Sequence, residues 1–263
     1  MLNDAQIQQA AENLWQAEQS GQWTEPLSNI HAGADVDDAY RIGLAVRDLK
    51  VACGRRVKGH KIGLTSRAMR ELTGATEPDY GFIFDNWFVL EGTTVGRAAM
   101  NRPLVEVELA FVMGQELVGP SINAADVIRA TDFVLPALEI VDSRYAGRGQ
   151  NMLVDSISDA ATCGFVVLGG NPVKLTDIDV RRVSASLSIN GSVMESGSAA
   201  AVMGNPINAV VWLANKLLEF GVTMQPGDVI LSGSFVKAIP FDAGDTLVAL
   251  FDPLGEVTLA VGP

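Results

Sequence analysis

The sequence has few cysteines, few histidines and no long apolar run. Its 263 residues include two cysteines and two histidines, so a histidine-rich zinc site cannot be assembled. Cys53 and Cys163 lie far apart without metal-type spacing, which fits reduced thiols. No apolar segment approaches the ~18 residues of a membrane helix, and the first residues carry no secretion signal. We therefore expect a soluble, cytoplasmic protein.

Positive charge is also scarce. The chain has 19 lysines and arginines against 31 acidic residues, a formal net charge of −12, which argues against a nucleic-acid binder. No G-x-G-x-x-G, P-loop or G-x-S-x-G motif occurs, so neither a nucleotide cofactor nor a serine hydrolase is indicated. The expected partner is a small molecule, with neither nucleic acid nor membrane involved.

Two glutamates occupy a stretch, residues 103–113, that otherwise has the pattern of an apolar strand. Because side chains alternate along a strand, Glu106 and Glu108 point to the same face. A solvated sheet face explains such a pair when it stands alone. Glu139, however, is a third acid inside a second apolar stretch, residues 133–141, and buried acids are rare without a partner. The three carboxylates offer a hard oxygen ligand set for Mg²⁺, Mn²⁺ or Ca²⁺.

The densest basic run, residues 55–66, precedes these strands. Lys61 shares a predicted strand face with Gly59 and Gly63, where the backbone is open to a ligand. Asp79 follows a proline and precedes Gly81, which is most often the pattern of a turn residue.

The chain changes character along its length. Helical periodicity covers residues 4–19 and 35–53, whereas strands dominate after residue 105, with further helices at 124–130 and from 206 onward. We expect an α+β fold, with a helical N-terminal region over residues 1–75 and a strand-rich mixed-sheet catalytic body over residues 76–263.

Five motifs then carry a family resemblance, in the family's order and spacing. They are residues 58–66, 77–81, 106–112, 136–139 and 231–235. Together they resemble the 2-hydroxypenta-2,4-dienoate (2-oxopent-4-enoate) hydratase group of the fumarylacetoacetate hydrolase superfamily, nearly end to end. The first two motifs are most similar to the 2-oxohept-4-ene-1,7-dioate hydratase branch.

The resemblance implies a body of the fumarylacetoacetate hydrolase C-terminal type with Mg²⁺ or Mn²⁺ held by Glu106, Glu108 and Glu139. It also implies that Lys61 and Asp79 form an acid–base pair, or that Lys61 instead holds the substrate carboxylate as a cation.

Three further residues are expected to contact the substrate. Ser158 and Ser234 are assigned to the substrate or catalytic water, although serines in loops are usually turn formers. Arg144 is assigned to a distal substrate carboxylate or to an acid of the site, with a surface position as the alternative.

The resemblance implies a hydratase that adds water to a 2-hydroxy-2,4-dienoate to give a 4-hydroxy-2-oxo acid in meta-cleavage aromatic catabolism. One alternative is a 4-oxalocrotonate-type decarboxylase, because residues 142–145 also occur in decarboxylase relatives whereas residues 151–165 are more hydratase-like. A non-catalytic partner subunit is the other. A homo-oligomer is expected, as is a complex with a downstream aldolase or a paired decarboxylase.

Overall fold

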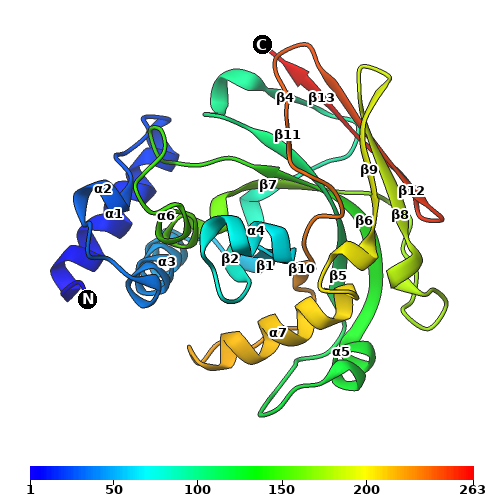
Figure 1. The fold of residues 1–263 in the computed structure, drawn as a ribbon, viewed down its shortest axis with the longest axis horizontal. Coiled ribbons are helices and arrows are strands. Elements are labelled where there is room, and N and C mark those ends of the chain that lie inside the picture. The colour runs from blue at the N-terminus through cyan, green and yellow to red at the C-terminus, as the bar shows by residue number, and fades with distance from the viewer.

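The computed structural model describes residues 1–263, which form seven α-helices and 13 β-strands (Figure 1). The helices are α1 (Asp4–Ser20), α2 (Leu27–Ile30), α3 (Val36–Ala52), α4 (Arg67–Thr73), α5 (Ala124–Ala130), α6 (Met152–Ser158) and α7 (Pro206–Leu218). None of them is long and apolar enough to cross a membrane.

The strands are β1 (Val57–Gly63), β2 (Asp79–Phe84), β3 (Phe88–Val89), β4 (Thr94–Gly96), β5 (Leu104–Met113), β6 (Thr131–Val141), β7 (Cys163–Leu168), β8 (Ser184–Ile189), β9 (Ser192–Ser198), β10 (Val229–Leu231), β11 (Ile239–Pro240), β12 (Thr246–Asp252) and β13 (Gly255–Gly262). The expected α+β class is confirmed.

Local sequence explains where the main helices begin. The side chain of Asn3 caps α1 and that of Asp35 caps α3, each in a reciprocal capping box, which satisfies backbone donors that a helix start leaves free. Asn205 caps α7, and Pro206 takes the first helical position, where its missing N–H costs nothing. The short helices α2 and α6 were not predicted.

An eight-stranded mixed sheet forms the centre of the molecule. Its strand order is β2-β1-β10-β5-β6-β7-β3, with β11 also paired to β5. The two longest strands, β5 and β6, are antiparallel neighbours, and β1 pairs with both β2 and β10. Thus a strand from the predicted region 1–75 is built into the sheet of the predicted body 76–263. The division of the chain at residue 75 stays a prediction.

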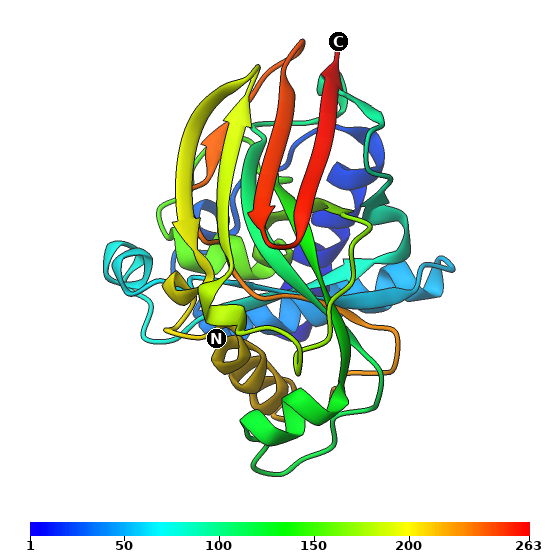
Figure 2. The same ribbon diagram turned by 90° about the vertical axis from the view of Figure 1, so that its right-hand side faces the viewer.

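A second sheet packs against the first. Its order is β4-β13-β12-β8-β9, and Figure 2 shows this sheet from its outer face. Strand β13 contacts β6 and β7, and side chains of both sheets belong to one hydrophobic cluster. The two sheets therefore share a core.

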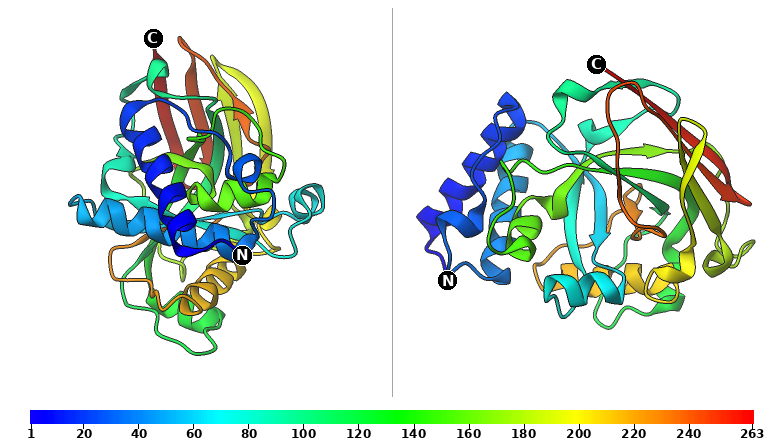
Figure 3. Two further views of the ribbon diagram at one scale, coloured as in Figure 1. Left: turned by 90° about the vertical axis from the view of Figure 1, so that its left-hand side faces the viewer. Right: turned by 45° about the horizontal axis from the view of Figure 1, so that its top comes forward.

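The N-terminal helices cover the opposite side of the molecule, where α1 packs on α3 and α3 on α6 (Figure 3). The large sheet curls, so that its edge strand β2 meets the turn of residues 160–162 just before β7. This curl brings residues from both ends of the sheet to one face.

Candidate metal centre

Strands β5 and β6 place the three predicted glutamates together. Glu106 lies directly opposite Glu139 in the antiparallel register, and Glu108 follows two residues later on the same face. One carboxylate oxygen from each residue lies within 4.8 Å of the others. Glu108 and Glu139 are fully buried, so the interpretation of this face as a solvated one is wrong.

The oxygens of this cluster are poorly satisfied by the protein itself. The amide of Gly233 donates to Glu108 Oε2 at 2.7 Å, but Glu108 Oε1 and Glu139 Oε2 accept no hydrogen bond, and Glu139 Oε1 forms an ion pair with Lys61. Buried carboxylates without partners are costly. An all-oxygen set of this kind fits a hard divalent cation such as Mg²⁺, Mn²⁺ or Ca²⁺.

Lys61 and Asp79 lie beside the glutamates. Lys61 Nζ is 3.1 Å from Glu139 Oε1, and it donates to the carbonyl oxygen of Ala161 at 3.0 Å. Asp79 is opposite Gly63 in the β1–β2 register. A Cβ atom on Gly63 would lie 2.2 Å from Asp79 Oδ1 and 3.6 Å from Lys61 Nζ, so glycine leaves the space that these two side chains occupy.

Burial and charge together set the ionisation of the metal-free site. Burial opposes the charged form of Lys61, yet the carboxylates of Glu139, Glu106 and Asp79 outweigh it and raise the Lys61 pKa. Burial raises the pKa of Asp79 despite the nearby Lys61 ammonium. Burial likewise raises the pKa of Glu106 to about 7 and that of Glu108 above its usual range. In the metal-free site, burial therefore opposes ionisation of Asp79, Glu106 and Glu108, while neighbouring carboxylates stabilise the Lys61 ammonium.

The two predicted substrate serines lie in different surroundings: Ser234 contacts β5 between two glutamates of the cluster, whereas Ser158 lies on α6. The Ser234 hydroxyl donates to the Val236 carbonyl at 2.9 Å and accepts weakly, at 3.3 Å, from the amide of Val107, between the two glutamates of β5. Ser158 ends α6, where it donates to the Asp155 carbonyl and lies 2.9 Å from the Tyr145 hydroxyl. Their contacts with substrate stay predictions.

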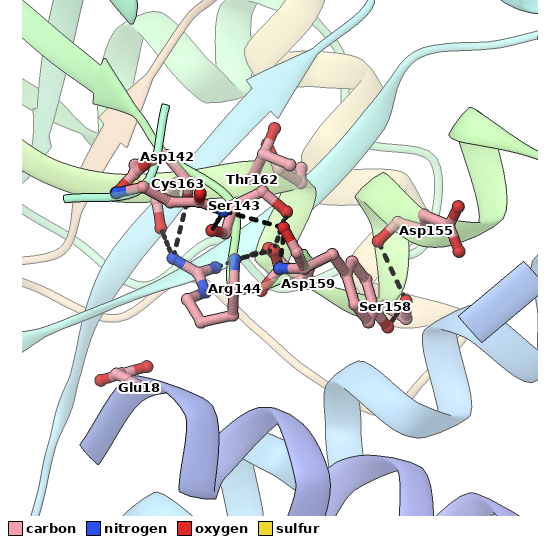
Figure 4. A network of polar contacts seen from close by, with 12 residues as sticks. Glu18, Asp142, Ser143, Arg144, Asp155, Ser158, Asp159, Thr162 and Cys163 are labelled. Atoms are coloured by element: carbon pink, nitrogen blue, oxygen red, sulfur yellow. Dashed lines mark hydrogen bonds and ion pairs between the residues drawn. The ribbon is translucent and has the colours of Figure 1, made fainter. Parts of the chain in front are cut away.

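Arg144 is buried, so its alternative assignment to the surface is wrong. Its guanidinium binds Asp159 and backbone carbonyls rather than any glutamate of the cluster (Figure 4). The role predicted for it at a substrate carboxylate stays untested.

Three neighbours of the site were not predicted. The side chain of Ser156, from α6, lies near the Asp79 carboxylate and opposes the rise of its pKa. The buried thiol of Cys163 has its pKa raised by burial and by the negative charge of Glu139. The third is the Ala161 carbonyl, a main-chain group. The apolar spacing of Val154 and Ile157 behind a possible Asn151 cap was the signal for α6.

Comparison with known proteins identifies one matching family and similar proteins that are named as hydratases. Residues 40–261 match the family described as fumarylacetoacetate (FAA) hydrolase C-terminal. The chain is 39% identical to a 2-oxo-hept-4-ene-1,7-dioate hydratase of Escherichia coli, over 94% of this chain and 95% of the relative. It is 37% identical to a 2-keto-4-pentenoate hydratase of Paraburkholderia xenovorans (strain LB400), over 97% and 95%.

Among solved structures, the chain is similar to 4-oxalocrotonate decarboxylase from Pseudomonas putida G7 complexed with magnesium and adipate. The TM-score is 0.95 at 32% identity, and the match covers 99% of both chains.

Proposed function

The chain belongs to the fumarylacetoacetate hydrolase C-terminal family, and from that premise we propose that it is a hydro-lyase, a divalent-metal-dependent hydratase. It adds water to a 2-hydroxy-2,4-dienoate and gives a 4-hydroxy-2-oxo acid, within meta-cleavage aromatic catabolism. The observation that carries the proposal is the cluster of three glutamates, two of them fully buried, with oxygens within 4.8 Å of one another beside Lys61. Hydratase relatives that align over nearly the whole chain support it.

The metal ligands in this proposal are Glu106, Glu108 and Glu139, and the ion is Mg²⁺ or Mn²⁺. The carboxylate oxygens that lack protein partners support this assignment, as does the magnesium named in the decarboxylase complex. When bound, such an ion supplies Lewis acidity that stabilises negative charge on the substrate's 2-oxo oxygen.

Lys61 and Asp79 have distinct roles in the proposal. Conversion of the dienol to the unsaturated ketone removes the proton of the 2-hydroxyl and places one on C5, and water addition then places the hydroxyl of water on C4 and a proton on C3. Asp79, whose pKa is raised by burial, is the group that delivers a proton to carbon. Lys61, whose ammonium is stabilised by the surrounding carboxylates, stays charged and orients the anionic substrate.

A 4-oxalocrotonate-type decarboxylase is the second candidate, because the decarboxylase of known structure is so similar over the full chain. A non-catalytic partner subunit is the third, and the presence of Lys61, Asp79 and all three glutamates in one cluster speaks against it.

Turnover assays separate these candidates. The purified protein is incubated with Mg²⁺ or Mn²⁺ and 2-hydroxypenta-2,4-dienoate or 4-oxalocrotonate, and dienol absorbance and product masses are followed. A gain of water supports the hydratase, and loss of carbon dioxide supports the decarboxylase. Absence of turnover with both substrates rejects both enzymes. The variant Glu106→Gln should be inactive, whereas the matched variant Glu256→Gln, at an exposed site on β13, should keep wild-type turnover.

Assembly and location complete the proposal. Val193, Met194 and Leu250 are exposed on strands of the outer sheet, which supports a homo-oligomer, since exposed apolar patches favour association. Light scattering of the purified protein tests this, and co-purification tests a complex with a downstream aldolase or a paired decarboxylase. The two free cysteines support a cytoplasmic location.

A further inference from the structure

The turn between α6 and β7 has an unusual backbone. Ala160, Ala161 and Thr162 have φ values of 52°, 50° and 58°, three consecutive left-handed residues of which none is glycine. Side chains of L-residues disfavour this conformation. Such strain persists where the surrounding structure enforces it, and it often marks a functional site.

The turn meets the proposed catalytic pair through two main-chain carbonyls. The Ala161 carbonyl accepts a hydrogen bond from Lys61 Nζ at 3.0 Å, so this ammonium is held between that oxygen and Glu139, 3.1 Å away. The Ala160 carbonyl packs against Gly81, where a Cβ atom would lie 1.9 Å from its oxygen. Gly81 faces Lys61 across the β1–β2 pair, so the turn docks directly over the lysine.

Arg144 binds the residues on both sides of this turn (Figure 4). Its Nε donates to Asp159 Oδ1 at 2.5 Å and its Nη2 to the Asp159 carbonyl at 2.7 Å. Its Nη1 donates to the Cys163 carbonyl at 2.5 Å. Asp159 immediately precedes the left-handed residues and Cys163 immediately follows them, so one guanidinium joins the two ends of the turn.

Arg144 and Asp159, here called the clamp, are buried, so little of the Arg144 side chain is free to bind another ligand. Arg144 is 7% exposed and Asp159 is 3% exposed. Nη1 also donates to the Asp142 carbonyl at 3.1 Å, and the guanidinium lies 5.2 Å from the ring centroid of Trp87. A fixed, planar fork of donors suits arginine and not lysine.

We propose that Arg144 is a positioning residue that, with Asp159, holds the left-handed turn Ala160–Thr162 so that the Ala161 carbonyl fixes the Lys61 ammonium beside Glu139. The consequence for turnover rests on the proposed function, in which Lys61 orients the substrate. The positioning itself is a property of the folded chain and can be measured without substrate.

The first test uses the wild-type protein. Nitrogen-15 NMR of the lysine side chains, with Mg²⁺ present, measures hydrogen exchange at Lys61 Nζ against the exposed Lys174 and Lys237. We expect Lys61 to exchange at least tenfold more slowly. Exchange as fast as that of the exposed lysines overturns the proposal, whether or not the protein is a hydratase.

The second test compares Arg144→Lys and the milder Asp159→Asn with a matched exposed pair, Arg181→Lys and Asp179→Asn, whose side chains form an ion pair at the surface. In either clamp variant that folds, we expect faster exchange at Lys61 Nζ and a fall in kcat of about 10- to 100-fold, an effect of the size that misplacing a substrate-orienting group can have. KM and Mg²⁺ affinity should change less than twofold.

The outcomes separate the two proposals. Unchanged exchange and kcat in a folded clamp variant overturn the positioning role. A large rise in KM with unchanged kcat and exchange also overturns it, in favour of direct substrate binding by Arg144. If no dienoate is turned over, the function fails, while the exchange rates still decide whether the clamp holds Lys61.

Discussion

Replacement of Glu106 by glutamine should change how the stability of the metal-free protein depends on pH. Glu106 sits opposite Glu139 in the cluster, and burial, which outweighs the nearby Lys61 ammonium and is reinforced by Glu139 and Asp79, raises its pKa from the usual 4.5 to about 7. Below pH 4.5 the carboxyl is protonated in both folded and unfolded chains. Between 4.5 and about 7 the folded chain keeps the proton that the unfolded chain loses, so stability falls as pH rises.

The size of this effect follows from the same two values. The difference between 4.5 and about 7, at ~1.36 kcal/mol for each pKa unit, amounts to at most about 3 kcal/mol of unfolding free energy. The loss is complete above the folded pKa. Mg²⁺ should reverse it, because the ion binds the ionised carboxylates; at 100 times its dissociation constant it adds ~2.7 kcal/mol.

Urea unfolding in EDTA at pH 5, 6, 7 and 8, followed by tryptophan fluorescence, measures the prediction. The free-energy difference between wild type and Glu106→Gln should fall by 1 to 3 kcal/mol, an order-of-magnitude range, from pH 5 to pH 8. Glu256→Gln, at an exposed position, should show no such trend. A wild-type minus Glu106→Gln difference that is constant with pH would refute the burial argument.

Three further changes test other parts of the structure. Lys61→Ala should lower kcat by about 100-fold or more while Mg²⁺ still stabilises the protein against urea; wild-type kcat would remove Lys61 from the mechanism. Gly81→Ala places a Cβ 1.9 Å from the Ala160 carbonyl oxygen and should cost about 1 to 3 kcal/mol in urea, whereas Gly33→Ala, with open space around it, should be near neutral. Asn205→Ala removes the cap of α7 and should cost about 1 kcal/mol; an unchanged urea midpoint would show that the cap is dispensable.

Local signals allowed much of the fold to be predicted. Helix α5 has the predicted bounds, and α1 and α3 match the predicted ranges 4–19 and 35–53 to within one residue at each end. The missed α6 has seven residues, as does the correctly predicted α5, but α6 follows a polar, glycine-containing loop and ends in serines that favour turns. Capping and periodicity are local properties, whereas the sheet order depends on contacts that no single segment encodes.

Local sequence patterns predict only part of the glutamate cluster. Alternation along β5 places Glu106 and Glu108 on one face from sequence alone. That Glu139 lies opposite Glu106 depends on the register of β5 with β6, and a slip of one residue would send it to the other face. The occurrence of all three acids in apolar stretches, and then the family resemblance, grouped the three residues, whereas strand periodicity alone did not.

The Arg144 clamp shows why residue type alone does not determine the role of a side chain. An arginine next to a candidate site suggests a bound carboxylate, but here the carboxylate is Asp159, and the group presented to Lys61 is a main-chain carbonyl with no sequence signature. The left-handed run Ala160–Thr162 also contradicts local propensity, as strained functional turns do. If the clamp positions Lys61, any reaction that uses this lysine needs it. In that case the motif of residues 142–145 reflects the geometry of the lysine, and it does not distinguish a hydratase from a decarboxylase.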